Sequence, residues 1–218
     1  MNNLDKFAIV FDLDDTLYAE EDYVISGIKF LEIFLSNNYE FPEKDYLLEG
    51  YLNGEKDFLE LACKKLKLPR DSKQSLLWLY RLHNPNIELF SGIRDTLDSL
   101  FHMKSNVSIL TDGRSVTQRL KVKSLGLNNL PVYISEEYSS EKPAKKRFLE
   151  IQKDFPNKKY VYIADNPVKD FQAPLEMDWI CIGANWIKNR IHKIDLNQMP
   201  KICLNSPDEI KEVLLNLP

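Results

Sequence analysis

The chain has 218 residues, and its 29 Lys and Arg residues against 33 Asp and Glu residues give a formal net charge of −4. A nucleic-acid-binding module of this size normally gathers a basic excess on one face, whereas the basic clusters here are short and far apart, so we expect no nucleic-acid partner. The chain is 44% apolar and 28% charged, which is typical of a folded globular protein with one large domain or a core with a smaller addition.

Cysteine and glycine usage excludes several further classes. Cys63, Cys181 and Cys203 form no Cys-x-x-Cys pair, which favours reduced thiols over a disulfide framework or a zinc site. Only 7 glycines occur, and neither Gly-x-Gly-x-x-Gly nor the P-loop pattern is present. No apolar run approaches the roughly 18 residues of a membrane helix, and none near the N-terminus resembles a signal-peptide core. We therefore predict a cytoplasmic protein without a membrane partner; the sequence specifies no oligomeric state.

The chain begins with an apolar run at residues 7–11 that stops abruptly at Asp12. This pattern predicts a strand buried on both faces that opens onto a polar edge. Residues 18–88 follow with helical spacing, for example apolar side chains at 25, 28, 31 and 35, and with turn signals such as Asn53-Gly54 between the segments. We therefore expect a small all-helical insertion directly behind the first strand.

Strands and helices alternate after the insertion. Apolar runs predict strands at 107–110, 132–134, 160–164 and 179–182. Helices are expected at 93–103, at 116–125 with apolar residues at 116, 120, 122 and 125, and from Lys142-Pro143 onwards with Phe148, Leu149 and Ile151 on the inner side. A last helix is expected at 207–217. The alternation predicts an α/β fold with a doubly wound parallel sheet, in which 1–17 and 89–218 form the core and 18–88 a separate helical domain.

Polar residues follow each predicted strand, and open α/β sheets place their ligand sites beyond the carboxyl ends of the strands. Each short stretch alone could be a capped turn or a surface residue. Together they would bring several carboxylates to one edge, where mutual repulsion requires a cation and hard oxygen ligands favour Mg²⁺. The residues in question are Asp12, Asp14, Asp15 and Thr16; Thr111, Asp112, Gly113 and Arg114; Glu141, Lys142 and Pro143; and Asp165, Asn166 and Asp170.

These stretches, in this order, resemble the four motifs of the haloacid dehalogenase-like hydrolase superfamily over residues 7 to about 182. The matches are residues 11–17, 109–113, 141–148 and 163–170. Ala164 stands where the family usually has glycine, a small change. The insertion after the first motif resembles the helical cap of the family, which is expected to close over the site, exclude water and choose the substrate.

The resemblance implies a role for each motif residue. Asp12 would be the nucleophile that forms an aspartyl-phosphate, and Asp14 the general acid and base. The dehalogenase branch lacks a carboxylate at the position of Asp14, so its presence favours phosphate transfer. Mg²⁺ would be held by the carboxylates of Asp12 and Asp165 and by the main-chain carbonyl of Asp14. The phosphoryl group would be bound by Thr111, Lys142 and the backbone N–H groups of Asp112 and Gly113. Thr16, Asn166 and Asp170 would support these residues, Asp170 by orienting Lys142 or a metal-bound water.

The function implied is a Mg²⁺-dependent phosphatase acting on a small phosphorylated metabolite, with a sugar phosphate as the leading substrate class. A 5′-nucleotidase and a phosphosugar mutase are alternatives within the same superfamily. A catalytically silent binding module is a third, although Asp12, Asp14, Lys142 and Asp165 are all present.

Overall fold

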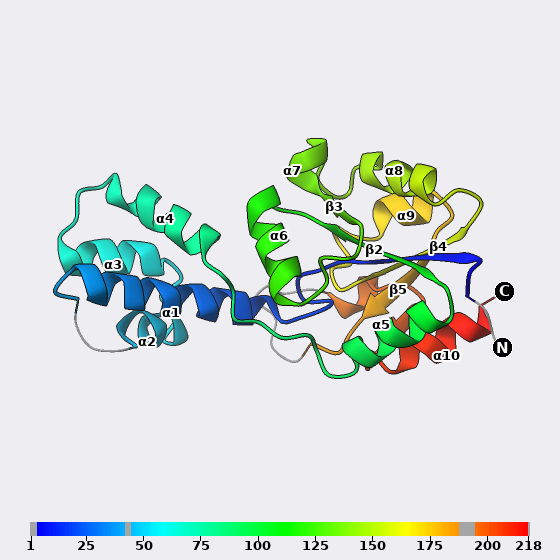
Figure 1. Cartoon of the computed structure of the whole chain (residues 1–218), viewed down its shortest axis with the longest axis horizontal. Coiled ribbons are helices and arrows are strands. Elements are labelled where there is room, and N and C mark those ends of the chain that lie inside the picture. The colour runs from blue at the N-terminus through cyan, green and yellow to red at the C-terminus, as the bar shows by residue number, and fades with distance from the viewer. Residues whose placement is uncertain (1–3, 42–44, 188–194, 218) are drawn as a thin grey trace. The chain divides into compact units, whose positions relative to one another are not determined.

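A computed structural model describes residues 4–41, 45–187 and 195–217, and the chain folds as two compact units (Figure 1). The first unit comprises Met1–Glu20 and Glu88–Pro218, and the second comprises Glu21–Ile87. The units thus change over at residues 20/21 and 87/88, whereas the sequence placed the boundaries at 17/18 and 88/89. No described helix has both the length and the apolarity to cross a membrane.

The first unit is built on a six-stranded sheet whose paired strands are all parallel, in the order β3-β2-β1-β4-β5-β6 (Figure 1). This confirms the predicted doubly wound α/β fold. The strands are β1 (Phe7–Phe11), β2 (Asn106–Thr111), β3 (Val132–Ile134), β4 (Lys159–Ala164), β5 (Ile180–Ala184) and β6 (Ile202–Leu204). The last strand was not predicted, since its three residues carry too little periodicity to distinguish a strand from a loop.

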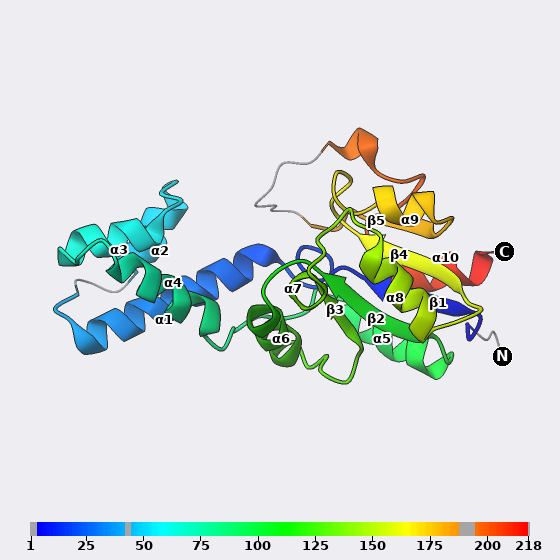
Figure 2. The same ribbon diagram turned by 90° about the horizontal axis from the view of Figure 1, so that it is seen from above.

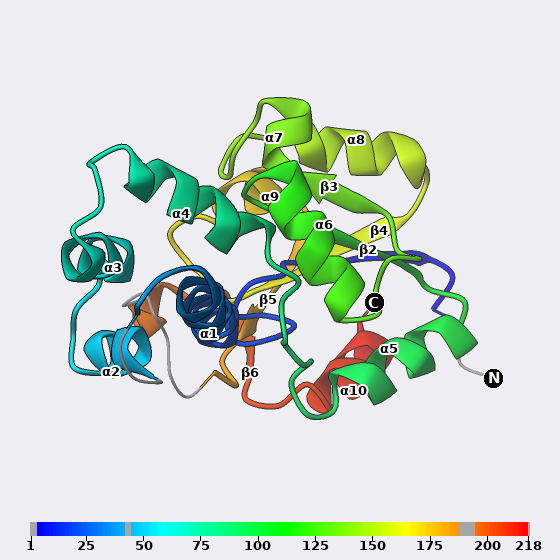
Figure 3. The same ribbon diagram turned by 60° about the vertical axis from the view of Figure 1, so that its left-hand side comes forward.

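Helices cover both faces of this sheet. Figures 1 and 3 show α8 and α9 on one face and α5 and α10 on the other. The helices of the first unit are α5 (Ile93–His102), α6 (Ser115–Ser124), α7 (Ser135–Tyr138), α8 (Lys146–Asp154), α9 (Gln172–Glu176) and α10 (Glu209–Asn216), with a 3₁₀ turn at Leu196–Gln198. Because both faces are covered, all five residues of β1 are buried, as its uninterrupted apolar run requires.

The second unit consists of four helices around its own apolar core. Figure 2 shows the long helix α1 with the three shorter helices packed beside it. The helices are α1 (Glu20–Asn38), α2 (Tyr46–Leu52), α3 (Phe58–Leu66) and α4 (Ser72–Leu82). Ile28, Leu31 and Leu35 of α1 are fully buried among apolar side chains of the other three helices. The 3.6-residue period of the sequence thus accounts for the packing of this unit.

The structure corrects one of the predicted helices and adds buried residues to another. Helix α8 begins at Lys146, and the Lys142-Pro143 peptide, which is cis, lies in the turn before the helix. Phe148 and Ile151 are buried as expected, but Leu149 is 46% exposed. Helix α6 and its C-cap bury Val122 and Leu125 of the apolar residues named from the sequence, but the helix also buries the polar Gln118 and Lys121, and Val116 is 55% exposed.

Candidate active site

The carboxyl ends of three adjacent strands define a pocket in the first unit. Asp12 follows β1, Thr111 ends β2 and Asp165 follows β4, and β1 lies between the other two strands. From β1 the chain continues to β2 on one side of β1, and it returns later to β4 on the other side of β1. The strand order reverses at this point, and doubly wound sheets bind their ligands at such a switch point. The pocket has a volume of about 140 Å³, several times the ~30 Å³ share of one water molecule.

Eight of the ten site residues expected from the sequence line this pocket. They are Asp12, Asp14, Thr111, Asp112, Lys142, Asp165, Asn166 and Asp170. Gly113 instead lines a neighbouring pocket, and its backbone N–H donates to Ser135 Oγ at 2.9 Å. That N–H group is therefore already engaged, contrary to its expected part in phosphate binding. Thr16 is fully buried outside the pocket, where its carbonyl accepts a hydrogen bond from Trp186 Nε1 at 3.2 Å.

Lys142 joins two aspartates at the floor of the pocket. Its Nζ lies 2.6 Å from Asp12 Oδ1 and 2.6 Å from Asp170 Oδ1, and its side chain is only 6% exposed. Burial lowers the pKa of Lys142, but Asp12 and Asp170 outweigh this effect and hold the pKa above its usual range. Lys142 is therefore a fixed ammonium group beside Asp12. Asp170 is held in turn by the Tyr162 hydroxyl at 3.1 Å and by the Asn166 backbone N–H at 2.9 Å.

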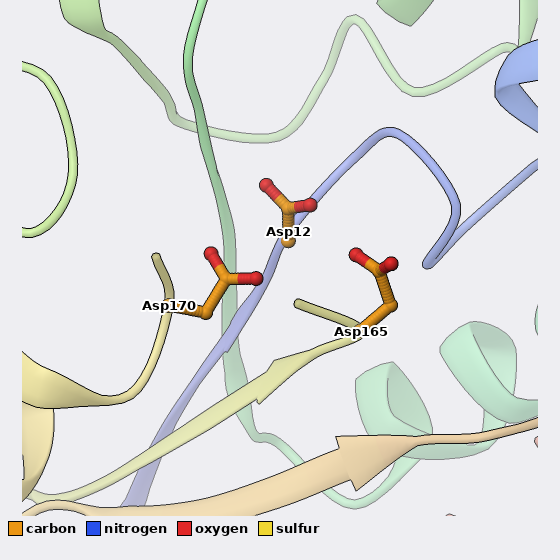
Figure 4. A group of neighbouring side chains, drawn as sticks. All are labelled: Asp12, Asp165 and Asp170. Atoms are coloured by element: carbon orange, nitrogen blue, oxygen red, sulfur yellow. The ribbon is translucent and has the colours of Figure 1, made fainter. Parts of the chain in front are cut away.

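Asp12, Asp165 and Asp170 gather three carboxylates around one point (Figure 4). All three residues are buried, and one carboxylate oxygen of each lies within 4.8 Å of the others. Burial raises the pKa of Asp12, and the neighbouring Asp170 and Asp165 raise it further, while Lys142 opposes the shift. Buried carboxylates this close together are the donor set that a hard divalent cation such as Mg²⁺ accepts.

Asp14 faces a second set of donors. Its Oδ1 accepts hydrogen bonds from Lys121 Nζ at 2.7 Å and from the Tyr18 hydroxyl, and its Oδ2 accepts one from Gln118 Nε2 at 2.9 Å. Burial raises the pKa of Asp14, but Lys121 and the hydrogen bonds outweigh burial and bring the pKa below its usual value. The sequence did not indicate Gln118 or Lys121, because polar residues on a helix ordinarily face solvent.

Arg147 is a further residue that the sequence did not indicate. This fully buried residue donates from Nη1 to the Thr111 carbonyl at 2.7 Å and pairs through Nη2 with Asp112. The Asp112 carboxylate also accepts from the Lys142 backbone N–H at 3.2 Å. Arg147 thus ties the end of β2 to the segment that carries Lys142.

Three charged residues at the pocket were not among the ten expected site residues. Asp15, Glu20 and Lys169 all line it. Burial raises the pKa of Glu20 to about 7, and the nearby Asp14 and Asp15 carboxylates contribute to the shift.

The parallel sheet and its aspartate-lined pocket define a class of α/β enzymes that work from the carboxyl edge of the central strands. Residues 9–184 match the haloacid dehalogenase-like hydrolase family, so the chain belongs to this family. The resemblance drawn from the four motifs is thereby confirmed, and the protein is a hydrolase by family.

Similar proteins include both phosphatases and a dehalogenase. A glyceraldehyde 3-phosphate phosphatase of Methanocaldococcus jannaschii is 26% identical over 225 residues, which cover 96% of this chain and 97% of the relative. Among solved structures, the HAD-hydrolase YfnB of Bacillus subtilis, bound to magnesium, has a TM-score of 0.65 at 18% identity, covering 96% of this chain and 98% of YfnB. A 2-haloacid dehalogenase of Pseudomonas syringae has a TM-score of 0.64 at 19% identity, covering 95% and 97%. These structures share the fold, and the reaction has to be argued from the site.

Proposed function

We propose that this protein is a phosphomonoesterase that hydrolyses a small phosphate ester, with a sugar phosphate as the leading substrate class, through an aspartyl-phosphate at Asp12. The observation that carries the proposal is the pairing of Asp12 with Lys142 in a pocket that also holds the Asp14 carboxylate. A carboxylate at the position of Asp14 separates phosphate transfer from dehalogenation, because an alkoxide leaving group needs a proton donor and a halide does not.

In the first step, Asp12 attacks the phosphorus atom while the bond between phosphorus and the leaving oxygen breaks, and Asp14 gives its proton to that oxygen. In the second step, a water attacks phosphorus, Asp14 takes the proton of the water, and Asp12 is released with inorganic phosphate. The lowered pKa of Asp14 favours the base form that the second step uses. Asp14 therefore has to take up a proton before it serves as the acid in the first step.

Several residues are proposed to hold the phosphoryl group. The Lys142 ammonium lies beside Asp12 and neutralises charge that develops on the phosphoryl oxygens. The Thr111 hydroxyl and the Asp112 backbone N–H would donate to the same oxygens from the end of β2. Gly113 is left out of this set, because its N–H donates to Ser135.

The donor set fits Mg²⁺, which we propose as the cofactor. The Asp12 and Asp165 carboxylates and the Asp14 main-chain carbonyl would hold the ion, and Asp170, engaged with Lys142, Tyr162 and Asn166, would orient the lysine. When bound, the ion supplies positive charge that offsets the repulsion between the carboxylates and an anionic substrate.

Three further features are part of the proposal. The Glu21–Ile87 unit is proposed as the helical cap of the family, because it is inserted directly after the first motif. The M. jannaschii relative acts on a phosphorylated three-carbon sugar by its name, which supports a small sugar phosphate as substrate. The buried Cys63 and Cys181 thiols support a reducing compartment such as the cytoplasm.

The test is a screen of sugar phosphates, 5′-nucleotides and p-nitrophenyl phosphate, with Mg²⁺ and with EDTA, ranked by kcat/KM. We expect Mg²⁺-dependent release of phosphate, a sugar phosphate at the top, and no turnover by Asp12→Asn. Asp98→Asn is the matched control, because Asp98 is exposed on α5 away from the pocket. Activity that survives in Asp12→Asn would contradict the mechanism, and a nucleotide at the top would contradict the substrate class.

A further inference from the structure

Helix α6 directs two polar side chains into the protein interior. Gln118 is 2% exposed and Lys121 is 5% exposed, whereas the apolar Val116 on the same helix is 55% exposed. Residues three apart lie on one face of a helix, so Gln118 and Lys121 point the same way. Burying an ammonium group is costly unless it is paired and hydrogen-bonded. The buried ammonium group of Lys121 therefore requires a partner in the interior.

That partner is the Asp14 carboxylate. Lys121 Nζ donates to Asp14 Oδ1 at 2.7 Å, and Gln118 Nε2 donates to Asp14 Oδ2 at 2.9 Å. The two donors thus hold the two oxygens of the carboxylate from one side of the pocket wall. A hydrogen bond from a charged donor is roughly twice as strong as a neutral one, and two bonds to different oxygens fix the rotation of the carboxylate as well as its place.

We propose that Gln118 and Lys121 are positioning residues that hold the Asp14 carboxylate in the orientation required for proton transfer to the leaving oxygen. The inference rests on the proposed function, since it assigns a role to Asp14 as the proton donor. It adds a pair of residues from α6 that lies outside the four motifs.

Gln118 also connects Asp14 to the phosphate side of the pocket. Its Nε2 lies 2.6 Å from Thr111 Oγ1 and 2.9 Å from the Asp112 carbonyl. The Thr111 oxygen accepts from Gln118, and its own hydrogen points to the Asp112 carbonyl at 3.4 Å. In the proposed complex a phosphoryl oxygen would take the place of that long contact. One amide group therefore sets the distance between the proton donor and the group that binds phosphate. Misplacement of reacting groups by about 1 Å costs on the order of 100-fold in rate.

A positioning role is distinguished from a structural one by its dependence on the leaving group. A good leaving group such as p-nitrophenolate departs without help, whereas a poor one such as p-methoxyphenolate needs its proton in the transition state. A merely destabilised protein loses the same factor on both substrates. Loss of proton-donor alignment instead selectively slows the ester with the poor leaving group.

The experiment measures kcat/KM for a series of aryl phosphates, from p-nitrophenyl to p-methoxyphenyl phosphate, with Lys121→Met and Gln118→Met. Gln118→Met keeps the length of the side chain and Lys121→Met shortens it by one atom, and both substitutions remove the donor. We expect a loss of roughly 10- to 100-fold on p-methoxyphenyl phosphate, a part of the roughly 10²- to 10⁴-fold that general acid catalysis supplies, and of less than about 3-fold on p-nitrophenyl phosphate. Lys121→Arg should restore much of the loss. Lys123→Met on the exposed side of α6 is the control and should leave the whole series unchanged.

A double-substitution cycle tests whether the two residues act through Asp14. In an Asp14→Asn background, Lys121→Met should change the dependence on the leaving group no further, because the proton donor is already lost. An equal loss on all substrates, or a further loss in the Asp14→Asn background, would overturn the inference while the phosphatase proposal stood. If the wild-type protein hydrolysed none of the aryl phosphates, the proposed function would itself be wrong. Gln118→Met provides the same test if Lys121→Met does not fold.

Discussion

The two units of the molecule bury acidic side chains in opposite ways. In the helical unit, Glu32 of α1 is 7% exposed and accepts hydrogen bonds from the backbone N–H groups of Leu47 and Leu48 at 2.6 and 3.3 Å. These bonds satisfy two backbone N–H groups at the N-terminus of α2, where the Asp45 side chain makes no capping hydrogen bond. In the sheet unit, Asp12 and Asp14 face the side-chain ammonium groups of Lys142 and Lys121 and line a pocket.

This difference would separate a structural carboxylate from the proposed reactive ones. Two backbone N–H groups at a helix end hold Oε1 of Glu32. The aspartates are surrounded by groups that carry full charges and open onto space for a ligand. Burial alone therefore does not mark a functional site, and the kind of partner does. The following substitutions test this distinction.

The largest expected effect is that of Asp12→Asn on activity. We expect kcat/KM for phosphate monoesters to fall by at least about 10⁴-fold, since the nucleophile is removed and residual catalysis comes from binding alone. The free energy of unfolding should stay equal or rise, because a buried carboxylate with a raised pKa is replaced by a neutral amide. Steady-state kinetics and urea denaturation measure the two quantities. A stability loss as large as the activity loss would show that Asp12 is structural, like Glu32.

Lys142→Met should affect both activity and stability. Removal of the ammonium leaves Asp12 and Asp170 buried and facing each other, so we expect about 3–5 kcal/mol of destabilisation with Mg²⁺ chelated. The kcat/KM should fall by roughly 10²- to 10³-fold, because charge on the phosphoryl group is no longer neutralised. Lys145→Met is the control, since that lysine is 44% exposed. Urea denaturation that gave equal midpoints for the two variants would contradict this account.

Arg147→Met should have a smaller effect that falls first on stability. The Thr111 carbonyl loses its 2.7 Å donor and Asp112 loses its buried partner, which together cost about 2–3 kcal/mol. The loss in kcat should stay near 10-fold, because Arg147 acts on Lys142 only through Asp112. Thermal unfolding and kcat are measured beside Lys153→Met, an exposed control on the same helix. A loss of activity without any loss of stability would indicate that Arg147 contacts the substrate.

Glu32→Gln should have the smallest effect. The free energy of unfolding should change by no more than about 1 kcal/mol at neutral pH, since the amide oxygen still accepts hydrogen bonds from the backbone N–H groups of α2. Burial raises the pKa of Glu32 in the folded protein, with Leu47 and Leu48 opposing. The folded state therefore binds this proton more tightly than the unfolded state. Its favourable contribution to stability is present below the unfolded pKa of ~4.3 and is lost as the pH rises through the folded pKa.

The measurement is the free energy of unfolding of wild type and Glu32→Gln between pH 4 and pH 7. The difference between the two proteins should shift in favour of the Gln variant as the pH rises, while kcat/KM is unchanged. Glu32→Ala is the matched comparison and should lose about 1–3 kcal/mol, because it leaves the backbone N–H groups of α2 without their acceptor. A change in kcat/KM on substitution of Glu32 would contradict the distinction between the two units.

The sequence predicted the sheet and the pocket well, because both depend on local signals. The apolar run of β1 and the polar residues that follow it specify a buried strand with a reactive end, and parallel pairing then brings Asp12 and Asp165 together. Burial of Gln118, Lys121 and Arg147 could not be predicted in this way. Gln118 and Lys121 turn towards Asp14, which is 104 and 107 residues away in the chain, and Arg147 turns towards Asp112, 35 residues away, whereas helical periodicity describes only the apolar face. The same limit explains the exposure of Val116 and Leu149.

The central claim is that Asp12 takes up the phosphoryl group before water does. The most direct test is the stereochemistry at phosphorus, measured with a phosphate monoester made chiral with oxygen isotopes and with transfer to an acceptor alcohol in place of water. Two successive in-line displacements, first by Asp12 and then by the acceptor, invert the phosphorus twice. We expect net retention of configuration, and net inversion would show that the acceptor attacks the substrate directly without an aspartyl-phosphate.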